Sequence, residues 1–362
     1  MNKYRVILLN PYIPPSAVYR YGYDIFTAVE NAKLFTFVNN GKSIPPQFSE
    51  GSFISGGFKI IETLNKLLPN LAYKPFVNSI KGNKNDDLQT IIHYVAPMNR
   101  IKFPEFVNVV TFHDPISMLL ETSMFGEGNS KQSYKDFLKK IFQRRYLNSF
   151  KKFYNILCDT EYVKSILTSE GFSDCLRVIY PAIPPVYRPL RNKEVLRQKL
   201  NLPENKKLIL SVSSNLKRKN LSKVRETMLL LGDDYKLVRV GKSIMEGDIS
   251  FQGVNYDIMN EIYNACDAML FPSLYEGFGY PLVEAFSSGL PVVASDIEVF
   301  RELAAGAAIL TSPNDVSDLV LGVKSAIENS EKHRMMGLKR AERFSFDRFG
   351  SEINEYYSSV LD

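Results

Sequence analysis

The chain has 362 residues, enough for about two domains, and 45% of them are hydrophobic, which excludes an intrinsically disordered protein. No apolar run approaches the roughly 18 residues that span a bilayer, so we expect no membrane-spanning helix, and three scattered cysteines exclude a disulfide framework and favour a reducing cytoplasm. The net charge of +6 is concentrated in residues 131–152, and because no nucleic-acid-binding motif accompanies it, we expect no nucleic-acid partner.

Five short apolar runs in the first half of the chain are typical of buried strands. They are residues 4–9, 90–95, 107–112, 154–159 and 176–180. Because the ligand loops of a parallel sheet follow the carboxyl ends of its strands, the loop 10–15 after the first run, with Tyr21-Gly22-Tyr23 after it, is a candidate rim of a cleft. Neither G-x-G-x-x-G nor a Walker-type G-x-x-x-x-G-K occurs, which disfavours dehydrogenase and NTPase functions.

The basic segment 131–152 contains eight lysines and arginines and one aspartate, with apolar residues between them at roughly helical spacing. This pattern indicates an amphipathic helix. Its basic face is either solvated while the apolar face packs on a sheet, or held against anionic lipid, where each basic residue contributes roughly 1 kcal/mol. The sequence therefore leaves a peripheral membrane contact open at this segment.

Prolines at 181, 184, 185 and 189 form a stiff linker, where we place the boundary between a first domain, 1–185, and a second domain, 190–345. In the second domain, apolar runs at 207–213, 235–240, 268–271 and 292–295 predict strands. Helices are predicted to start at 221, and to span 257–264, 316–329 and the carboxyl-terminal segment 346–362. Strands that alternate with helices in this way predict an α/β class with doubly wound parallel sheets.

Arg218 and Lys219 directly follow the first strand of the second domain, at the end where ligand loops lie. Two cations at this place could pair with a diphosphate and offset the charge that grows on it when it leaves. The alternative is a solvated basic turn.

Glu276 lies in a glycine loop after the strand 268–271, and Pro281 is suited to the first position of the helix that follows. The free N–H groups at the start of that helix predict an anion site, most simply for phosphate. Glu284 lies one turn into the helix. Carboxylates repel phosphate but bind hydroxyls, so a ligand with hydroxyls at both ends and phosphate in the middle, a nucleotide sugar, would fit. The alternatives are a loop charge at Glu276 and a dipole-favoured helix charge at Glu284.

The segment PSLYEGFGYPLVEAFSSGLPVVASD, with seven residues between Glu276 and Glu284, resembles the E-x7-E signature of the family 4 retaining glycosyltransferases. VSSNLKRKNL is similar to the phosphate-binding loop of that family, and VVTFHDPIS to its strand followed by a His-Asp pair. The resemblance implies the GT-B fold, in which two Rossmann-like doubly wound domains face one another across a cleft. It also implies that the helix 346–362 crosses back to the first domain.

The resemblance implies that Glu276 positions and electrostatically supports the sugar and that His113 borders the sugar from the other domain. Arg218 and Lys219 would hold the diphosphate and Glu284 the ribose. The implied donor-binding residues are Arg218, Lys219, Gly277, Phe278, Gly279, Tyr280, Pro281, Leu282 and Glu284.

The implied reaction is transfer of a hexose from a UDP- or GDP-sugar to a hydroxyl of a glycan or lipid-linked acceptor, with retention at the anomeric carbon. No metal or other cofactor is expected, because fixed cations face the diphosphate. The implied location is the cytoplasm, at the inner face of the membrane. Two alternatives stay open: a glycoside phosphorylase on the same fold, and a non-catalytic sugar-nucleotide binder.

Overall fold

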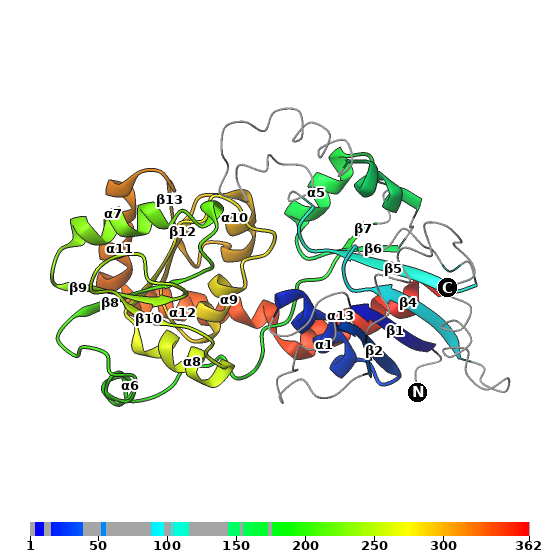
Figure 1. Ribbon diagram of the computed structural model, residues 1–362, viewed down its shortest axis with the longest axis horizontal. Coiled ribbons are helices and arrows are strands. Elements are labelled where there is room, and N and C mark those ends of the chain that lie inside the picture. The colour runs from blue at the N-terminus through cyan, green and yellow to red at the C-terminus, as the bar shows by residue number, and fades with distance from the viewer. Residues whose placement is uncertain are drawn as a thin grey trace. The chain divides into compact units, whose positions relative to one another are not determined.

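The computed structural model describes residues 4–10, 16–38, 52–55, 88–97, 103, 105–115, 144–152, 155–172 and 176–361. The described residues form two compact α/β units, each with its own sheet and helices (Figure 1). Unit 1 contains the described residues up to Pro115, those from Arg144 to Ala182, and those from Phe346 onward, whereas unit 2 contains Ile183–Ser345.

Unit 1 is built on a seven-stranded parallel sheet in the order β3-β2-β1-β4-β5-β6-β7. The strands are β1 (Tyr4–Asn10), β2 (Ala32–Val38), β3 (Ser52–Ser55), β4 (Gln89–Tyr94), β5 (Val107–Phe112), β6 (Asn155–Cys158) and β7 (Leu176–Val178). The chain adds strands first on one side of β1 and then on the other, which confirms the predicted doubly wound topology. Both β2 and β3 were missed, because neither forms a continuous apolar run.

The helices that the structure describes in full in unit 1 are α1 (Ala17–Ala28), α5 (Glu161–Ser169) and α13 (Phe346–Ser359). Tyr21-Gly22-Tyr23, which follow the loop predicted as a candidate rim of a cleft, lie in the middle of α1. The Ser16 hydroxyl caps α1 by accepting from the amide of Tyr19, and Tyr21 and Gly22 face the core. The residues 11–15, which precede the cap, lie outside the described part of the chain.

The carboxyl-terminal helix α13 belongs to unit 1, where it packs against α1. The Tyr357 hydroxyl lies 2.6 Å from Nδ1 of His93, whose Nε2 lies 2.7 Å from Oγ1 of Thr111, and the Tyr4 hydroxyl donates to Oδ1 of Asn354 at 2.9 Å. Burial lowers the pKa of His93 to about 3, so this ring is neutral. Helix α13 therefore completes the core of the unit that contains the start of the chain.

Unit 2 is built on a six-stranded parallel sheet in the order β10-β9-β8-β11-β12-β13. The strands are β8 (Lys207–Val212), β9 (Tyr235–Val240), β10 (Ile249–Phe251), β11 (Ala268–Phe271), β12 (Val292–Ser295) and β13 (Ile309–Thr311). The helices are α6 (Lys193–Lys199), α7 (Leu221–Leu231), α8 (Tyr256–Ala265), α9 (Tyr280–Ser287), α10 (Glu298–Ala304), α11 (Val316–Glu328) and α12 (Ser330–Ala341). Helices α7 and α11 bury their apolar faces against the sheet.

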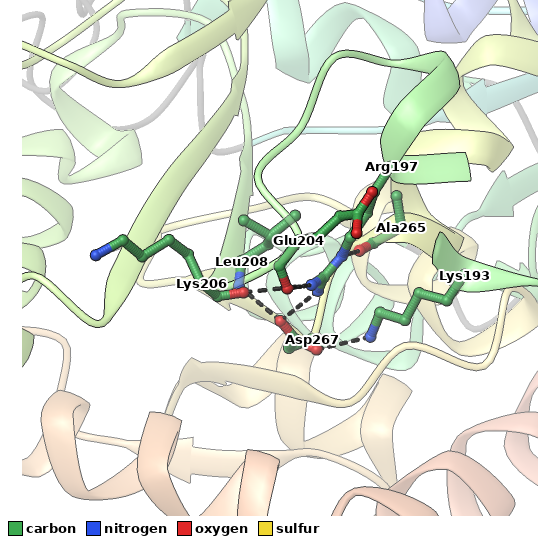
Figure 2. Close-up of polar contacts among 7 residues, drawn as sticks. All are labelled: Lys193, Arg197, Glu204, Lys206, Leu208, Ala265 and Asp267. Atoms are coloured by element: carbon green, nitrogen blue, oxygen red, sulfur yellow. Dashed lines mark hydrogen bonds and ion pairs between the residues drawn. The ribbon is translucent and has the colours of Figure 1, made fainter. Parts of the chain in front are cut away.

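Asp267, at the amino end of β11, joins three elements of unit 2 (Figure 2). Its carboxylate accepts from the amide of Leu208 at 2.6 Å, from Nη2 of Arg197 at 2.7 Å and from Nζ of Lys193 at 2.7 Å. Burial alone would raise the pKa of Asp267, but these donors and cations outweigh burial, and the pKa lies below its ordinary value.

Arg197, which pairs with Asp267, makes further hydrogen bonds at the amino ends of β8 and β11. It is 7% exposed, and its guanidinium also donates to the carbonyls of Ala265, Glu204 and Lys206 at 3.0, 3.2 and 3.3 Å (Figure 2). These contacts join α6 to the amino end of the sheet, which is the end opposite to the loops after β8 and β11.

Of the predicted basic helix, residues 131–143 lie outside the described part of the chain. The described residues 144–152 bury Leu147 and Phe150. They expose the basic residues Arg144, Arg145, Lys151 and Lys152. No helix within the described ranges is long and apolar enough to cross a membrane.

Candidate functional site

The carboxyl end of β11 leads into the glycine loop, residues 272–279, and then into α9. Gly279 is the N-cap of α9 at φ 96°, and Pro281 lies in the first two positions of the helix. A Cβ on Gly279 would lie 2.8 Å from the Phe300 ring, so both the backbone angle and the packing require glycine. The predicted order of strand, glycine loop and helix is confirmed, and the helix begins one residue earlier than the proline.

Arg218 and Lys219 lie in a 3-10 turn, Lys217–Lys219, after the end of β8, and they meet Glu276 of the glycine loop. Nη1 of Arg218 donates to Oε2 of Glu276 at 2.8 Å and to the Tyr275 carbonyl at 3.0 Å, and Nζ of Lys219 is bonded to Oε1 of Glu276. The predicted phosphate cations and the predicted sugar carboxylate are therefore one cluster.

Glu276 is only 5% exposed, so it is not a solvated loop charge. The Arg218 carbonyl also accepts from the amide of Leu274 at 2.7 Å, which ties the basic turn to the glycine loop through the backbone. Two cations against one carboxylate leave the cluster with a net positive charge at the carboxyl edge of the sheet, which suits an anionic ligand.

A third cation, Arg239 of β9, lies below this edge and was not predicted. It is fully buried, and Nη1 and Nη2 donate to the carbonyls of Ser211 and Ser213 at 2.9 and 2.6 Å. A Cβ on Gly241 would lie 2.5 Å from the Ser213 carbonyl, so this contact also needs glycine. Arg239 thus holds the end of β8, from which the basic turn starts. The sequence signal that could have identified Arg239 is a single arginine within an otherwise apolar strand.

Glu284 lies on α9, separate from the loop that carries Glu276, as predicted. It is 6% exposed, and its Oε2 accepts from the Tyr263 hydroxyl at 2.9 Å. Glu284 is in the second turn of α9, whereas the favourable dipole effect on an acid fades beyond the first turn. The helix dipole alone therefore does not explain why a glutamate occupies this buried position. Tyr263 was not predicted as a residue of the site.

The remaining predicted donor residues have mixed surroundings. Phe278 is 4% exposed, and its ring contacts those of Tyr280 and Phe344 with centroids at 4.9 and 5.9 Å, so its side chain is part of the packing. The Leu282 amide already donates to the Gly279 carbonyl at 3.0 Å. Among the other predicted donor residues of the loop and the helix start, Gly277, Tyr280 and Pro281 are partly exposed.

His113 belongs to unit 1, where it follows the carboxyl end of β5. Its Nδ1 lies 2.7 Å from Oδ2 of Asp159, and Nε2 donates to the Val95 carbonyl at 2.7 Å. Burial alone would lower the pKa of His113, but the Asp159 carboxylate and the Val95 carbonyl outweigh it, so the pKa lies above its ordinary value. Both ring nitrogens of His113 therefore have hydrogen-bond partners within unit 1. Asp159 was predicted only as a strand end.

Residues 192–343 match the protein-family model described as Glycosyl transferases group 1. The O-antigen chain mannosyltransferase B of Escherichia coli is 30% identical over 145 residues, which cover 37% of this chain and 38% of that protein. The O-antigen chain mannosyltransferase RfbU of Salmonella typhimurium is 25% identical over 272 residues, which cover 69% of this chain and 73% of that protein.

The crystal structure of Anabaena HepE in complex with UDP and glucose covers 98% of this chain and is itself covered completely, with a TM-score of 0.76 and 16% sequence identity. At this identity the likeness concerns the fold, and it confirms the predicted GT-B class. Over residues 192–343 the chain is therefore similar to the glycosyl transferases group 1 family, and its fold is of the GT-B class.

Proposed function

We propose that the protein transfers a hexose from a UDP- or GDP-sugar to a hydroxyl of a glycan or lipid-linked acceptor, with retention at the anomeric carbon. The observation that carries this proposal is the cluster of Arg218, Lys219 and Glu276, with Glu284 one helix turn beyond the amino end of α9. The names of the two enterobacterial relatives support a mannosyl donor, and the UDP complex of the Anabaena protein supports testing uridine as well.

Arg218 and Lys219 act on the diphosphate in this proposal. As the bond from the anomeric carbon to the diphosphate oxygen breaks, negative charge grows on that oxygen, and two fixed cations stabilise it. The same oxygen takes the proton of the acceptor hydroxyl, while the acceptor oxygen forms the new bond on the face that the diphosphate leaves. No side chain needs to form a covalent intermediate.

Glu276 lies between the groups that hold the diphosphate and the position proposed for the sugar ring. Its carboxylate bonds both cations, and diphosphate oxygens would compete with it for the same donors. When a donor sugar binds, the carboxylate is then available to the hydroxyls of the sugar ring, which it holds while the bond at the anomeric carbon breaks. Glu284, which would be repelled by phosphate, binds the ribose hydroxyls.

A screen of UDP, GDP, ADP and their sugars by thermal shift, followed by mass spectrometry and NMR of the product, tests the function. We expect one nucleoside diphosphate and its hexose to raise the melting temperature, and the product to keep the anomeric configuration of the donor. An inverted product would contradict the retaining reaction. Cleavage of a glycoside by inorganic phosphate alone would instead identify a phosphorylase, and binding without turnover a sugar-nucleotide binder.

Lys219→Met should weaken the binding of a nucleoside diphosphate by roughly 10- to 100-fold, because a hydrogen bond to a charged group contributes about 1.5–3 kcal/mol. Binding of the nucleoside without phosphate should change little. Isothermal titration calorimetry measures both. The matched control is Lys217→Met, which removes an exposed lysine from the same turn. Equal losses for the nucleoside and the diphosphate would contradict the role of Lys219.

Turnover should persist after dialysis against EDTA, because Arg218 and Lys219 supply the positive charge at the diphosphate that a divalent ion supplies in other transferases. Initial rates before and after dialysis, with and without added Mg²⁺ or Mn²⁺, measure this. A loss of rate that Mg²⁺ or Mn²⁺ restores would show that a metal takes part.

The proposed place of action is the cytoplasm at the inner face of the membrane, where a lipid-linked acceptor would lie. The support is the basic segment 131–152, whose described part exposes its arginines and lysines. Anionic lipid would attract such a face.

A further inference from the structure

Tyr263 of α8 is bonded to the carboxylate of Glu284. The hydroxyl lies 2.9 Å from Oε2, and it is also 3.4 Å from the Pro281 carbonyl at the start of α9. Tyr263 is fully buried and Glu284 is 6% exposed, so this hydrogen bond is shielded from water, where it is stronger than at a surface.

Tyr263 is itself held in place. The ring of Tyr187 packs edge-on against it, with centroids 5.8 Å apart. One turn earlier on α8, Oδ1 of Asn260 accepts from the Ser288 hydroxyl at 2.9 Å, and Ser288 also donates to the Glu284 carbonyl at 2.9 Å. Hydrogen bonds therefore join α8 to α9 and the residue after it at two neighbouring points, Tyr263 to Glu284 and Ser288 to Asn260.

We propose that Tyr263 is a positioning residue that orients Glu284 toward the ribose of the donor and so sets the preference for a ribonucleotide. The proposal rests on the proposed function, in which Glu284 binds ribose hydroxyls. A carboxylate has about four acceptor positions, so the bond from Tyr263 leaves capacity for ribose hydroxyls while it fixes the side-chain torsions of Glu284. Preorganised in this way, Glu284 loses less conformational entropy when the nucleotide binds.

The test compares the nucleoside diphosphate that the protein binds, UDP or GDP, with its 2′,3′-dideoxy analogue by calorimetry. We expect the wild-type protein to prefer the ribonucleotide by at least about tenfold, the scale of one hydrogen bond to a charged group. In Tyr263→Phe, which removes a single oxygen atom, the preference should fall to less than about threefold, with unchanged affinity for the dideoxy analogue.

Tyr256→Phe is the matched control, because Tyr256 lies on the same helix and its ring contacts the same Tyr187 ring, with centroids 6.1 Å apart. It should keep the full preference. In a Glu284→Ala background, Tyr263→Phe should cause no further loss, because the tyrosine acts through that carboxylate.

The outcomes separate this inference from the proposed function. A wild-type protein that binds both nucleotides equally would overturn the ribose assignment of Glu284, and the inference with it. If the wild-type protein has the preference and Tyr263→Phe keeps it, the inference alone is overturned. Equal weakening of both nucleotides in Tyr263→Phe would show a merely structural tyrosine and would also overturn it.

Discussion

Glu276→Ala should reduce turnover more than ~100-fold, the scale for losing an electrostatic group that acts in the transition state, or about 2.7 kcal/mol of its stabilisation. Binding of the nucleoside diphosphate should stay as tight as in the wild type or become tighter. The reason is that Arg218 and Lys219 lose the carboxylate that now bonds both of them and become available to phosphate oxygens. Initial rates and calorimetry measure the two effects.

Two further variants make the Glu276 result interpretable. Glu276→Gln keeps an oxygen that can accept from Arg218 but removes the charge, and it should lose turnover to a similar extent. Glu298→Ala removes an exposed glutamate from the first turn of α10 and should leave the rate unchanged. Turnover within tenfold of the wild type in Glu276→Ala would show that the carboxylate does not take part in the reaction.

Asp267→Asn should lower the free energy of unfolding of unit 2 by about 3–5 kcal/mol, because it leaves the buried Arg197 without its counter-charge. The loss should concentrate at the amino edge of the sheet, where α6 meets β8 and β11. Urea unfolding, with hydrogen exchange followed at β8 and β11, measures it. Lys193→Met is the control and should cost no more than about 1 kcal/mol, because that lysine is 39% exposed.

The same cluster makes unit 2 sensitive to acid. Because the pKa of Asp267 is lower in the folded chain than in the unfolded chain, its contribution is complete at neutral pH. The contribution is lost as the pH falls below about 3.9, the unfolded value, and through the lower folded value. The stability of Asp267→Asn should therefore converge with that of the wild type in acid, and a constant difference from pH 7 to pH 2 would contradict the ion-pair explanation.

The local pattern of apolar runs, glycines and prolines was enough to predict the strand, loop and helix that carry Glu276 and Glu284. The strand before Glu276, the glycine loop and the helix with Glu284 lie in one continuous stretch whose apolar runs and glycines act over a few residues. The helices α7, α8 and α11 were predicted for the same reason, since each has a clear apolar face. By contrast, α12 was missed because it is largely polar and exposed, and β10 because three residues are too few for a pattern.

Pairings between distant residues could not be predicted. Glu276 meets Lys219 across 57 residues of sequence and His113 meets Asp159 across 46, and no spacing rule connects them. Helix α1 was not predicted, although Ser16 caps it and the aromatic residues around Gly22 lie in it. In the folded chain the aromatic side chains of α1 gain more by packing against the sheet than the single Gly22 costs the helix, which is about 1 kcal/mol.

The return of α13 to unit 1 determines the order in which the two units can mature on the ribosome. Tyr357 is made 264 residues after its partner His93. At about 5–20 residues per second, the amino-terminal sheet stays without its last helix for on the order of 10–50 seconds. The described part of unit 2 runs without interruption from Ile183 to Ser345, so its synthesis is complete before α13 is made. During that interval the residues that α13 covers in the folded unit, His93 among them, lack that cover.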